Sequence, residues 1–337
     1  MFISILSSKR SLVKQTLMAV AGFMCCAALL PSLAFAQTYP TKPVTIIVSY
    51  PAGGDTDVIA RVFAERLGAR FGQQFVVENK PGASGTIGNA IVAKAPADGH
   101  TLLFTPSTIS TALLVLKPGS GAAYDTLADF TPIMQVGSQP LYLFTNNTSG
   151  IKNVKDLIDA AKADKVKTYG SPGSGSPMHV LGEMFNRSTG TKLQQVPYRG
   201  TGPVVTDLVG GHLSFAYSTL GPMAQHIASG KVVNLAIADS KRSVLSPDVP
   251  TLTEAGVKDA DITAWIGVMG PKGMPAGTVS ALNAAMNDIL KAPDVQQRLR
   301  AMGTIATGGD ASVLARVHAG DNAKYGKVIQ DLKIQAE

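Results

Sequence analysis

Short apolar runs separated by glycine-rich turns are the dominant pattern of the chain. The runs at 44–48, 75–78 and 101–104 have the length and composition of buried strands. One helical face after the first run collects five apolar residues: Val58, Ile59, Val62, Phe63 and Leu67. A second helix is expected over 86–94. This βαβαβ order predicts a parallel sheet covered by helices.

The same pattern restarts near residue 140. Strands are predicted at 141–144, 166–169, 193–196, 213–217 and 232–238. Helices are predicted at 153–163, 177–190, 201–209 and 223–229. After one further strand at 265–269, three helical stretches begin near residues 278, 294 and 311.

The last helices need a core to cover, so we expect them to return to the first group of strands. The chain then crosses between two lobes near residues 139 and 257, and two crossovers make a hinge. The expected fold is α/β with two lobes, each a parallel-rich sheet flanked by helices. The expected division is 37–138 for the first part of lobe 1, 139–256 for lobe 2, and 257–337 for the second part of lobe 1.

The first 36 residues have the pattern of an export signal. Three basic residues precede an almost wholly apolar run over 17–30, and Ala34-Phe35-Ala36 resembles a signal-peptidase cleavage site. The apolar run is shorter than the roughly 20 residues of a membrane span. An uncleaved anchor is therefore the less favoured alternative, and we expect cleavage after residue 36 and export.

Charge and cysteine content exclude several classes of site. Cleavage removes Cys25 and Cys26, the two cysteines of the chain, so no disulfide and no cysteine-based metal site or nucleophile is expected. It also removes three of 30 basic residues and none of 23 acidic ones, which leaves 27 against 23 and a net charge of +4. These basic residues are scattered, which argues against nucleic-acid binding.

Three turns share one design, in which a strand end leads through glycine or serine residues into a helix. They span 51–57, 82–88 and 171–177. The first amides of a helix lack partners within it and carry partial positive charge, and glycine lets a ligand approach the backbone. Ser174 and Ser176 add hydroxyl donors. One such turn is often only a connection, whereas two facing one cleft would form an anion site.

Asp57, in the first of these turns, has two interpretations. It caps the helix or stabilises its dipole, or it orients the turn amides that meet a ligand. We favour a structural role, because a carboxylate within an anion pocket repels the ligand.

Two other functional classes have weaker support. The segment 82–88 reads G-x-x-G-x-x-G instead of the dinucleotide fingerprint, and no Walker lysine follows any glycine turn. The chain has no G-x-S-x-G elbow. His179 and Glu183 form an i,i+4 pair that lacks an evident third metal ligand. An exported enzyme is therefore disfavoured, and no cofactor is expected.

Six motifs occur in order along the chain. They are Y-P-x-K-P at 39–43, P-A-G-G-x-x-D-x-x-A-R at 51–61, V-E-N-K-P-G-A at 77–83, D-G-x-T-L-L at 98–103, V-P-Y-R-G at 196–200 and P-D-V-P-T-x-x-E-A-G at 247–256. Together they resemble the Bug-type receptors of tripartite tricarboxylate transporters, and the resemblance covers essentially all of residues 39–330.

This resemblance implies a periplasmic two-lobe Venus-flytrap receptor that binds a di-, tri- or aromatic carboxylate without a metal or cofactor. The ligand contacts it implies in lobe 1 are Tyr50, Ala52, Gly53, Gly54, Asp57, Ser107 and Thr108. Those in lobe 2 are Ser171, Gly173, Ser174, Gly175, Ser176 and His179. We add Ser84 from the second turn as a further candidate.

Two positions depart from the family pattern. Ala52 replaces a usual proline, which should loosen its turn slightly. Ser218 stands where many members carry an aspartate, and the missing carboxylate suggests a ligand without an amino group. Arg199 would then meet a second ligand carboxylate bidentately, or it is a solvated loop residue.

The implied role is capture of a small carboxylate for the integral-membrane permease subunits of a tripartite tricarboxylate transporter. We expect a monomer that closes on its ligand. A periplasmic sensor that presents a carboxylate to a membrane signalling protein shares every motif, and it is the alternative.

Overall fold

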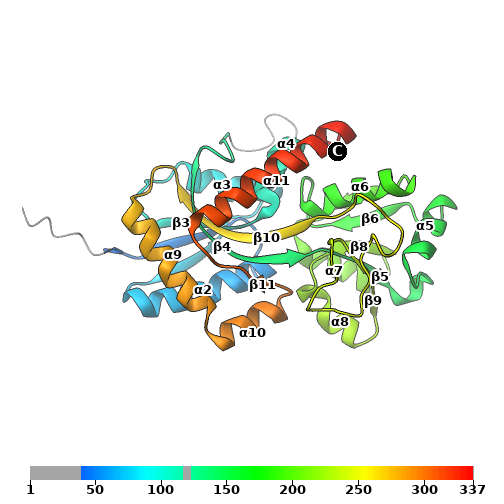
Figure 1. The fold of residues 1–337 in the computed structure, drawn as a ribbon, viewed down its shortest axis with the longest axis horizontal. Helices are drawn as coiled ribbons and strands as arrows, with labels where there is room; N and C mark the ends of the chain where they lie inside the picture. The colour runs from blue at the N-terminus through cyan, green and yellow to red at the C-terminus, as the bar shows by residue number, and fades with distance from the viewer. Residues whose placement is uncertain (1–38, 117–122, 337) are drawn as a thin grey trace, which may run out of the picture. The chain divides into compact units, whose positions relative to one another are not determined.

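A computed structural model of the protein describes residues 39–116 and 123–336, so the predicted leader lies outside the described residues. The residues from Pro40 onward form one compact unit. Two β-sheets, each flanked by helices, organise this unit (Figure 1). None of the helices in the described ranges combines the length and apolarity of a membrane span.

Sheet A has six strands in the order β11-β4-β10-β3-β1-β2. They are β1 (Val44–Val48), β2 (Phe75–Asn79), β3 (Thr101–Pro106), β4 (Phe130–Pro140), β10 (Thr263–Pro271) and β11 (Ile305–Ala306). β1 is parallel to β2 and β3, as the βαβαβ pattern predicts. β10 is antiparallel to β3 and β4, and β11 is antiparallel to β4.

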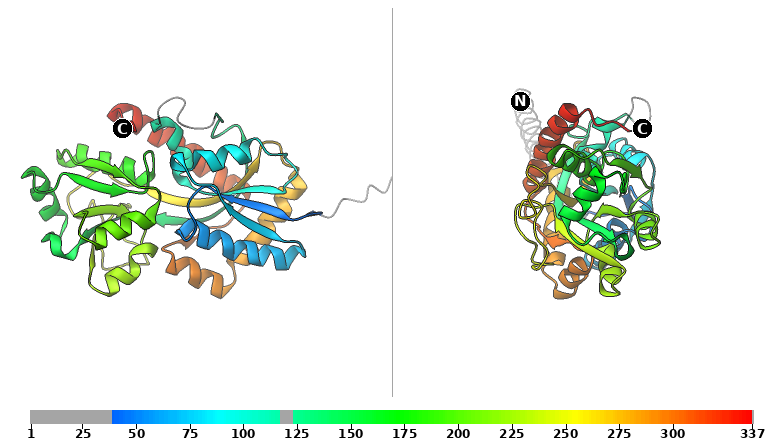
Figure 2. Two further views of the ribbon diagram at one scale, coloured as in Figure 1. Left: turned by 180° about the vertical axis from the view of Figure 1, so that it is seen from behind. Right: turned by 90° about the vertical axis from the view of Figure 1, so that its right-hand side faces the viewer.

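The helices that flank sheet A come from both ends of the described chain (Figure 2). They are α2 (Asp55–Phe71), α3 (Thr86–Ala93), α4 (Ala112–Val115), α9 (Ala276–Leu290), α10 (Pro293–Ala301) and α11 (Ala311–Leu332). In α2 the predicted apolar face is buried except for Val58, which lies at its edge and is 36% exposed. The three late helices begin close to the residues predicted from sequence.

Sheet B has five strands in the order β7-β6-β8-β5-β9. They are β5 (Tyr142–Asn146), β6 (Thr168–Ser171), β7 (Gln194–Pro197), β8 (Phe215–Ser218) and β9 (Val232–Ile237). β6 is parallel to β7 and β8, whereas β5 is antiparallel to β8 and β9.

The helices associated with sheet B are α5 (Val154–Lys162), α6 (Pro177–Thr189), α7 (Thr201–Val209) and α8 (Ala224–Ala228). Asn153 caps α5, because its side chain accepts a hydrogen bond from the Asp156 amide at 2.9 Å. Pro177 occupies the first turn of α6, where its missing N–H costs nothing. Both features agree with the sequence analysis.

The chain passes from sheet A to sheet B between β4 and β5, and it returns between β9 and β10. The strands beside these crossings pair antiparallel, so both sheets are mixed instead of predominantly parallel. The division at residues 138 and 256 stays a prediction. Tyr325, Ile329 and Ile334, at the end of the chain, pack into the apolar cluster that also contains Leu181 and Phe185 of α6.

The packing of α6 on β6 depends on Gly182. A Cβ built on Gly182 would lie 2.2 Å from Cζ of Tyr169, whose ring is fully buried. The Tyr169 hydroxyl donates hydrogen bonds to the His179 carbonyl at 3.2 Å and to Glu183 at 2.8 Å. The ring therefore has little freedom to move.

We expect Gly182→Ala to lower the free energy of unfolding by about 1–3 kcal/mol through overpacking. Gly320→Ala is the matched control, because it also lies within a helix but has no atom within 4 Å of the added Cβ. That change should stabilise the protein by about 0.5–1 kcal/mol. Urea unfolding measures both, and equal effects at the two positions would contradict the packing argument.

Candidate functional site

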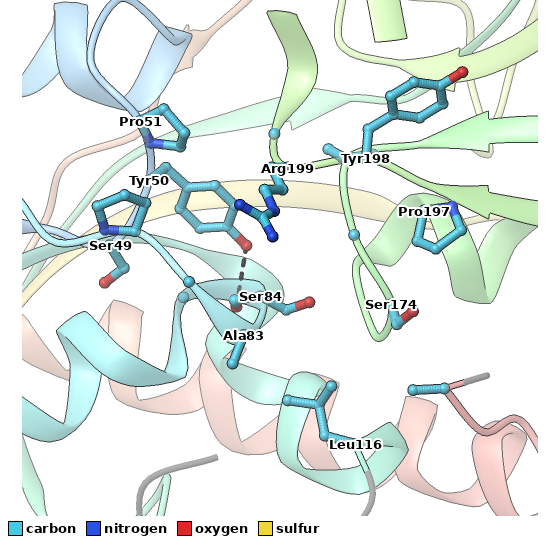
Figure 3. Close-up of a pocket in the computed structure, with 17 residues that line it drawn as sticks. Ser49, Tyr50, Pro51, Ala83, Ser84, Leu116, Ser174, Pro197, Tyr198 and Arg199 are labelled. Atoms are coloured by element: carbon cyan, nitrogen blue, oxygen red, sulfur yellow. Dashed lines mark hydrogen bonds between the residues drawn. The ribbon is translucent and has the colours of Figure 1, made fainter. Parts of the chain in front are cut away.

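The turns that follow four strands, β1 and β2 of sheet A and β6 and β7 of sheet B, open onto one cavity of about 610 Å³, here called the outer cavity. Figure 3 shows side chains from both sheets directed toward it. Its lining comprises Ser49, Tyr50, Pro51, Pro81, Gly82, Ala83, Ser84, Gly85, Leu116, Pro172, Gly173, Ser174, Pro197, Tyr198, Arg199, Gly200 and Ala336.

The rim of the outer cavity brings the two lobes close together at two glycines. A Cβ on Gly173 would lie 3.0 Å from Oγ of Ser84, and one on Gly200 would lie 3.4 Å from Cδ of Pro51. Gly173 and Gly200 follow strands of sheet B, whereas Ser84 and Pro51 follow strands of sheet A. Glycine at these points lets the two lobes approach each other closely.

The first turn is held in shape by Asp57. Its carboxylate accepts hydrogen bonds from the Gly53 amide and from the Asn79 side chain, both at 2.9 Å, and it forms an ion pair with Arg61 at 3.0 Å. Burial alone raises the pKa of Asp57, but the hydrogen bonds from Arg61, Gly53 and Asn79 outweigh it and hold the pKa below its usual value. Asp57 is 3% exposed and does not line the outer cavity. The start of α2 has no side-chain cap, so the contact of Asp57 with the Gly53 amide is that of the second interpretation, in which Asp57 orients an amide of the turn.

Ala52, Gly53 and Gly54 also lie outside the lining of the outer cavity. The turn presents its first residues, Tyr50 and Pro51, to the cavity. A sequence motif locates a turn but does not indicate which of its residues face inward.

The second turn contributes a strained backbone. Ala83 and Ser84 have φ values of +44° and +53°, a conformation that non-glycine residues seldom adopt. The Tyr50 hydroxyl donates a hydrogen bond to the Ser84 carbonyl at 3.3 Å. Burial raises the pKa of Tyr50 far above its usual value, so the phenol remains a neutral donor. Strain of this kind persists only where neighbouring groups hold it, and it is common at binding sites.

The third turn is clamped by the segment after β7. The amides of Tyr198 and Gly200 donate to the carbonyls of Ser171 and Pro172 at 2.9 and 3.1 Å. The Ser171 hydroxyl accepts a hydrogen bond from the Gln195 side chain at 2.6 Å, so Ser171 helps to fix the start of the turn. Gly173 and Ser174, by contrast, line the outer cavity.

The start of α6 is organised by a buried histidine. The Gly175 amide donates to Nδ1 of His179 at 3.1 Å, and the His179 amide donates to Oγ of Ser176 at 3.2 Å. Burial lowers the pKa of His179 to about 4, so the ring is neutral and Nδ1 accepts. Gly175, Ser176 and His179 therefore shape the third turn and do not line the outer cavity.

Arg199 carries the one charge among the described residues that line the outer cavity. Its side chain is exposed and forms no ion pair with any described residue. Figure 3 shows the Arg199 guanidinium and the Tyr50 ring directed toward the same part of the cavity. A guanidinium in this position offers a planar pair of donors to a carboxylate.

A second, smaller space of about 40 Å³ shares Tyr50 and Pro172 with the outer cavity and is here called the inner cavity. Its other lining residues are Asp55, Thr56, Pro106, Ser107, Thr108, Gln139, Pro177, Met178, Thr201, Thr219 and Ala264. Ser107 and Thr108, which begin the short helix η2 (Ser107–Ser110), were predicted as site residues. Ser218 is fully buried just before Thr219 and does not line this space.

The structure therefore brings seven predicted residues to the cavities. They are Tyr50, Ser84, Ser107, Thr108, Gly173, Ser174 and Arg199. The sequence motifs did not indicate the prolines of the outer lining or the other polar residues of the inner lining, above all Asp55. Asp55 stood inside a quoted motif, but at a position that the family pattern leaves open.

Comparison with known proteins gives one consistent result. The model of the tripartite tricarboxylate transporter family receptor matches residues 59–334. Protein BugT of Bordetella pertussis is 37% identical over 289 residues, which cover 85% of this chain and 88% of BugT.

Two solved structures from Rhodopseudomonas palustris are also similar. Rpa4515 with adipate has a TM-score of 0.82 and 31% identity, covering 88% of this chain and 99% of that one. MatC with bound malate has a TM-score of 0.80 and 30% identity, covering 86% and 100%.

His179 gives a pH prediction. The folded protein favours the neutral ring, with a pKa of about 4 against 6.5 for an unperturbed histidine. Its stabilising contribution is complete above pH 6.5 and is lost as pH falls toward 4. Each unit of pKa shift corresponds to about 1.4 kcal/mol, so between pH 7 and 4 the wild type should lose about 3 kcal/mol more unfolding free energy than His179→Asn.

Asparagine is the suitable replacement, because its side-chain oxygen can still accept the Gly175 amide but does not titrate in this range. Chemical unfolding at a series of pH values gives both curves. Parallel curves for the two proteins would show that His179 is not the titrating group.

Proposed function

Because the chain belongs to the tripartite tricarboxylate transporter receptor family, whose members are periplasmic solute-binding proteins, we propose that it captures a small carboxylate in the outer cavity. The ligand then passes to integral-membrane permease subunits. The proposal includes export by a cleaved signal and action as a monomer.

The observation that carries this proposal is the composition of the outer cavity. The lining from the two lobes includes the serines Ser84 and Ser174 and one guanidinium, without any acidic side chain among the described lining residues. Prolines, tyrosines and Leu116 supply apolar surface for a carbon skeleton. A volume of about 610 Å³ lies within the range of small-molecule sites.

The similar structures support the same class of ligand. One holds adipate and another malate, both of which are dicarboxylates. In this chain a second ligand carboxylate would meet Arg199, while the first is held by turn amides and hydroxyls.

A thermal-shift screen of the chain from residue 37 against carboxylates, amino acids and nucleotides tests the function. A ligand present at 100 times its dissociation constant adds about 2.7 kcal/mol of stability. Stabilisation by carboxylates supports the receptor function, whereas stabilisation by nucleotides alone contradicts it. Uptake of the stabilising acid by a deletion strain then distinguishes transport from the alternative of ligand sensing.

We expect Arg199→Gln to weaken hexanedioate binding roughly 10- to 100-fold, because a charge-assisted hydrogen bond is lost. Hexanoate, with one carboxylate, should lose less. Arg187→Gln, an exposed arginine in the last turn of α6, is the control of equal charge change and should leave both affinities within threefold. Calorimetric titration measures these affinities, and an equal loss for both acids would show that Arg199 does not meet the second carboxylate.

A further inference from the structure

The inner cavity differs in charge from the outer one. Asp55 is the one charged residue among its described lining residues, and Arg199 is absent from that lining. Asp55 follows Gly54, the N-cap of α2, so part of its role is to stabilise the positive end of that helix. That role accounts for an acid at this position but not for the polar groups gathered around it.

The Asp55 carboxylate is held in place by donors from three segments. Oδ2 accepts from the Gln139 side chain at 3.1 Å, at the end of β4, and from the Thr219 hydroxyl at 3.3 Å, just after β8. Oδ1 accepts from the Thr56 amide at 2.8 Å. Gln139 and Thr219 are 2% and 1% exposed, so these donors are themselves fixed. The carboxylate thus occupies a set position where the first crossing strand and both lobes meet.

Ser107 supplies an independent observation. It is 2% exposed and lines the inner cavity, yet its hydroxyl has no hydrogen-bond partner among the described residues. Buried hydroxyls normally have a partner, because an unpaired polar atom away from water is costly. Ser107 and Asp55 both line this space of about 40 Å³. A ligand group placed there can meet both.

We propose that Asp55 is a specificity-determining residue that selects ligands carrying a hydrogen-bond donor, a hydroxyl or an ammonium group, in addition to their carboxylate. Asp55 and Ser107 accept from that donor in the inner cavity, while the carboxylate stays in the outer cavity. The inference rests on the proposed function and narrows its ligand to hydroxy or amino acids.

Charge explains why the carboxylate of a ligand would bind in the outer cavity and its hydrogen-bond donor in the inner cavity. A carboxylate near Asp55 would be repelled at short range, with no cation in the described lining to offset it. A donor is attracted, and more strongly when it is cationic. The volume also suits a small group, since a space of this size holds roughly two or three water molecules.

Ser218 stands at a position where many members of the family carry an aspartate. The missing aspartate at that position suggested a ligand without an amino group. Asp55 reaches Thr219, the next residue along, from the opposite lobe. The Asp55 carboxylate of lobe 1 therefore lies near the place where those members have a carboxylate in lobe 2. A ligand with an amino group is then no longer disfavoured.

The test uses two sets of matched acids and calorimetric titration of the chain from residue 37. The first set is butanedioate, 2-hydroxybutanedioate and 2-aminobutanedioate. The second is butanoate, 4-hydroxybutanoate and 4-aminobutanoate. In whichever set shows binding, the hydroxy or the amino acid should bind the wild type at least tenfold more tightly than the unsubstituted acid of that set. The hydroxy and amino members show which donor Asp55 accepts.

Asp55→Asn should reduce this preference to less than threefold, because the charged acceptor is gone. Glu65→Gln removes one negative charge from an exposed position of the same helix, and it should retain the full preference. A role of Asp55 confined to joining the lobes would instead change the affinity of every acid by the same factor.

The inference alone is overturned by a wild type that binds the unsubstituted acid at least as tightly, or by a preference that survives in Asp55→Asn. It is also overturned alone if the wild type binds none of the six acids but another carboxylate stabilises it in the thermal-shift screen. If no carboxylate in that screen stabilises the wild type, the proposed function is overturned together with the inference. Folding of each variant is checked by its thermal unfolding midpoint without ligand.

Discussion

The parallel pairing of β1 with β2 and of β6 with β7 is the constraint on which the rest of the site depends. Parallel strands end at the same edge of a sheet, so the turns that follow each pair emerge together. Sheets A and B both direct such an edge toward the outer cavity. The antiparallel strands β4 and β10 lie in sheet A on the far side of β3 from β1, and they are adjacent to the two crossings of the chain. A ligand held between the edges therefore contacts both lobes at once.

Hydrogen bonds hold the turns at these edges in shape without a ligand. Asp57 fixes the first turn, Tyr50 holds the strained second turn, and His179 organises the third. None of these interactions requires a positively charged side chain facing the ligand. Preorganisation of this kind reduces the ordering cost of binding. In the proposed function, the charges of Arg199 in the outer cavity and Asp55 in the inner cavity then determine which groups of a ligand bind.

Much of the architecture followed from the spacing of apolar runs. The strands from β1 to β3 and from β5 to β9, the Asn153 cap and the late helices arise from local periodicity and local hydrogen bonds, which a sequence displays directly. β4 was missed, because its prolines, glycine and glutamines do not form a continuous apolar run. Its pairing with β10 comes from residues more than 100 positions away, and no local pattern reports it.

The sequence by itself determined the family, the two-lobe α/β fold and the three glycine-rich turns, because motif order and hydrophobic periodicity are properties of the chain. Tertiary structure decided which side of each turn faces a ligand. It turned Asp57 and His179 into supports, placed Arg199 in the outer cavity, and brought Asp55 beside Gln139 and Thr219. The position of Asp55 depends on residues 84 and 164 positions away along the chain, and these distances are fixed only when both sheets have formed.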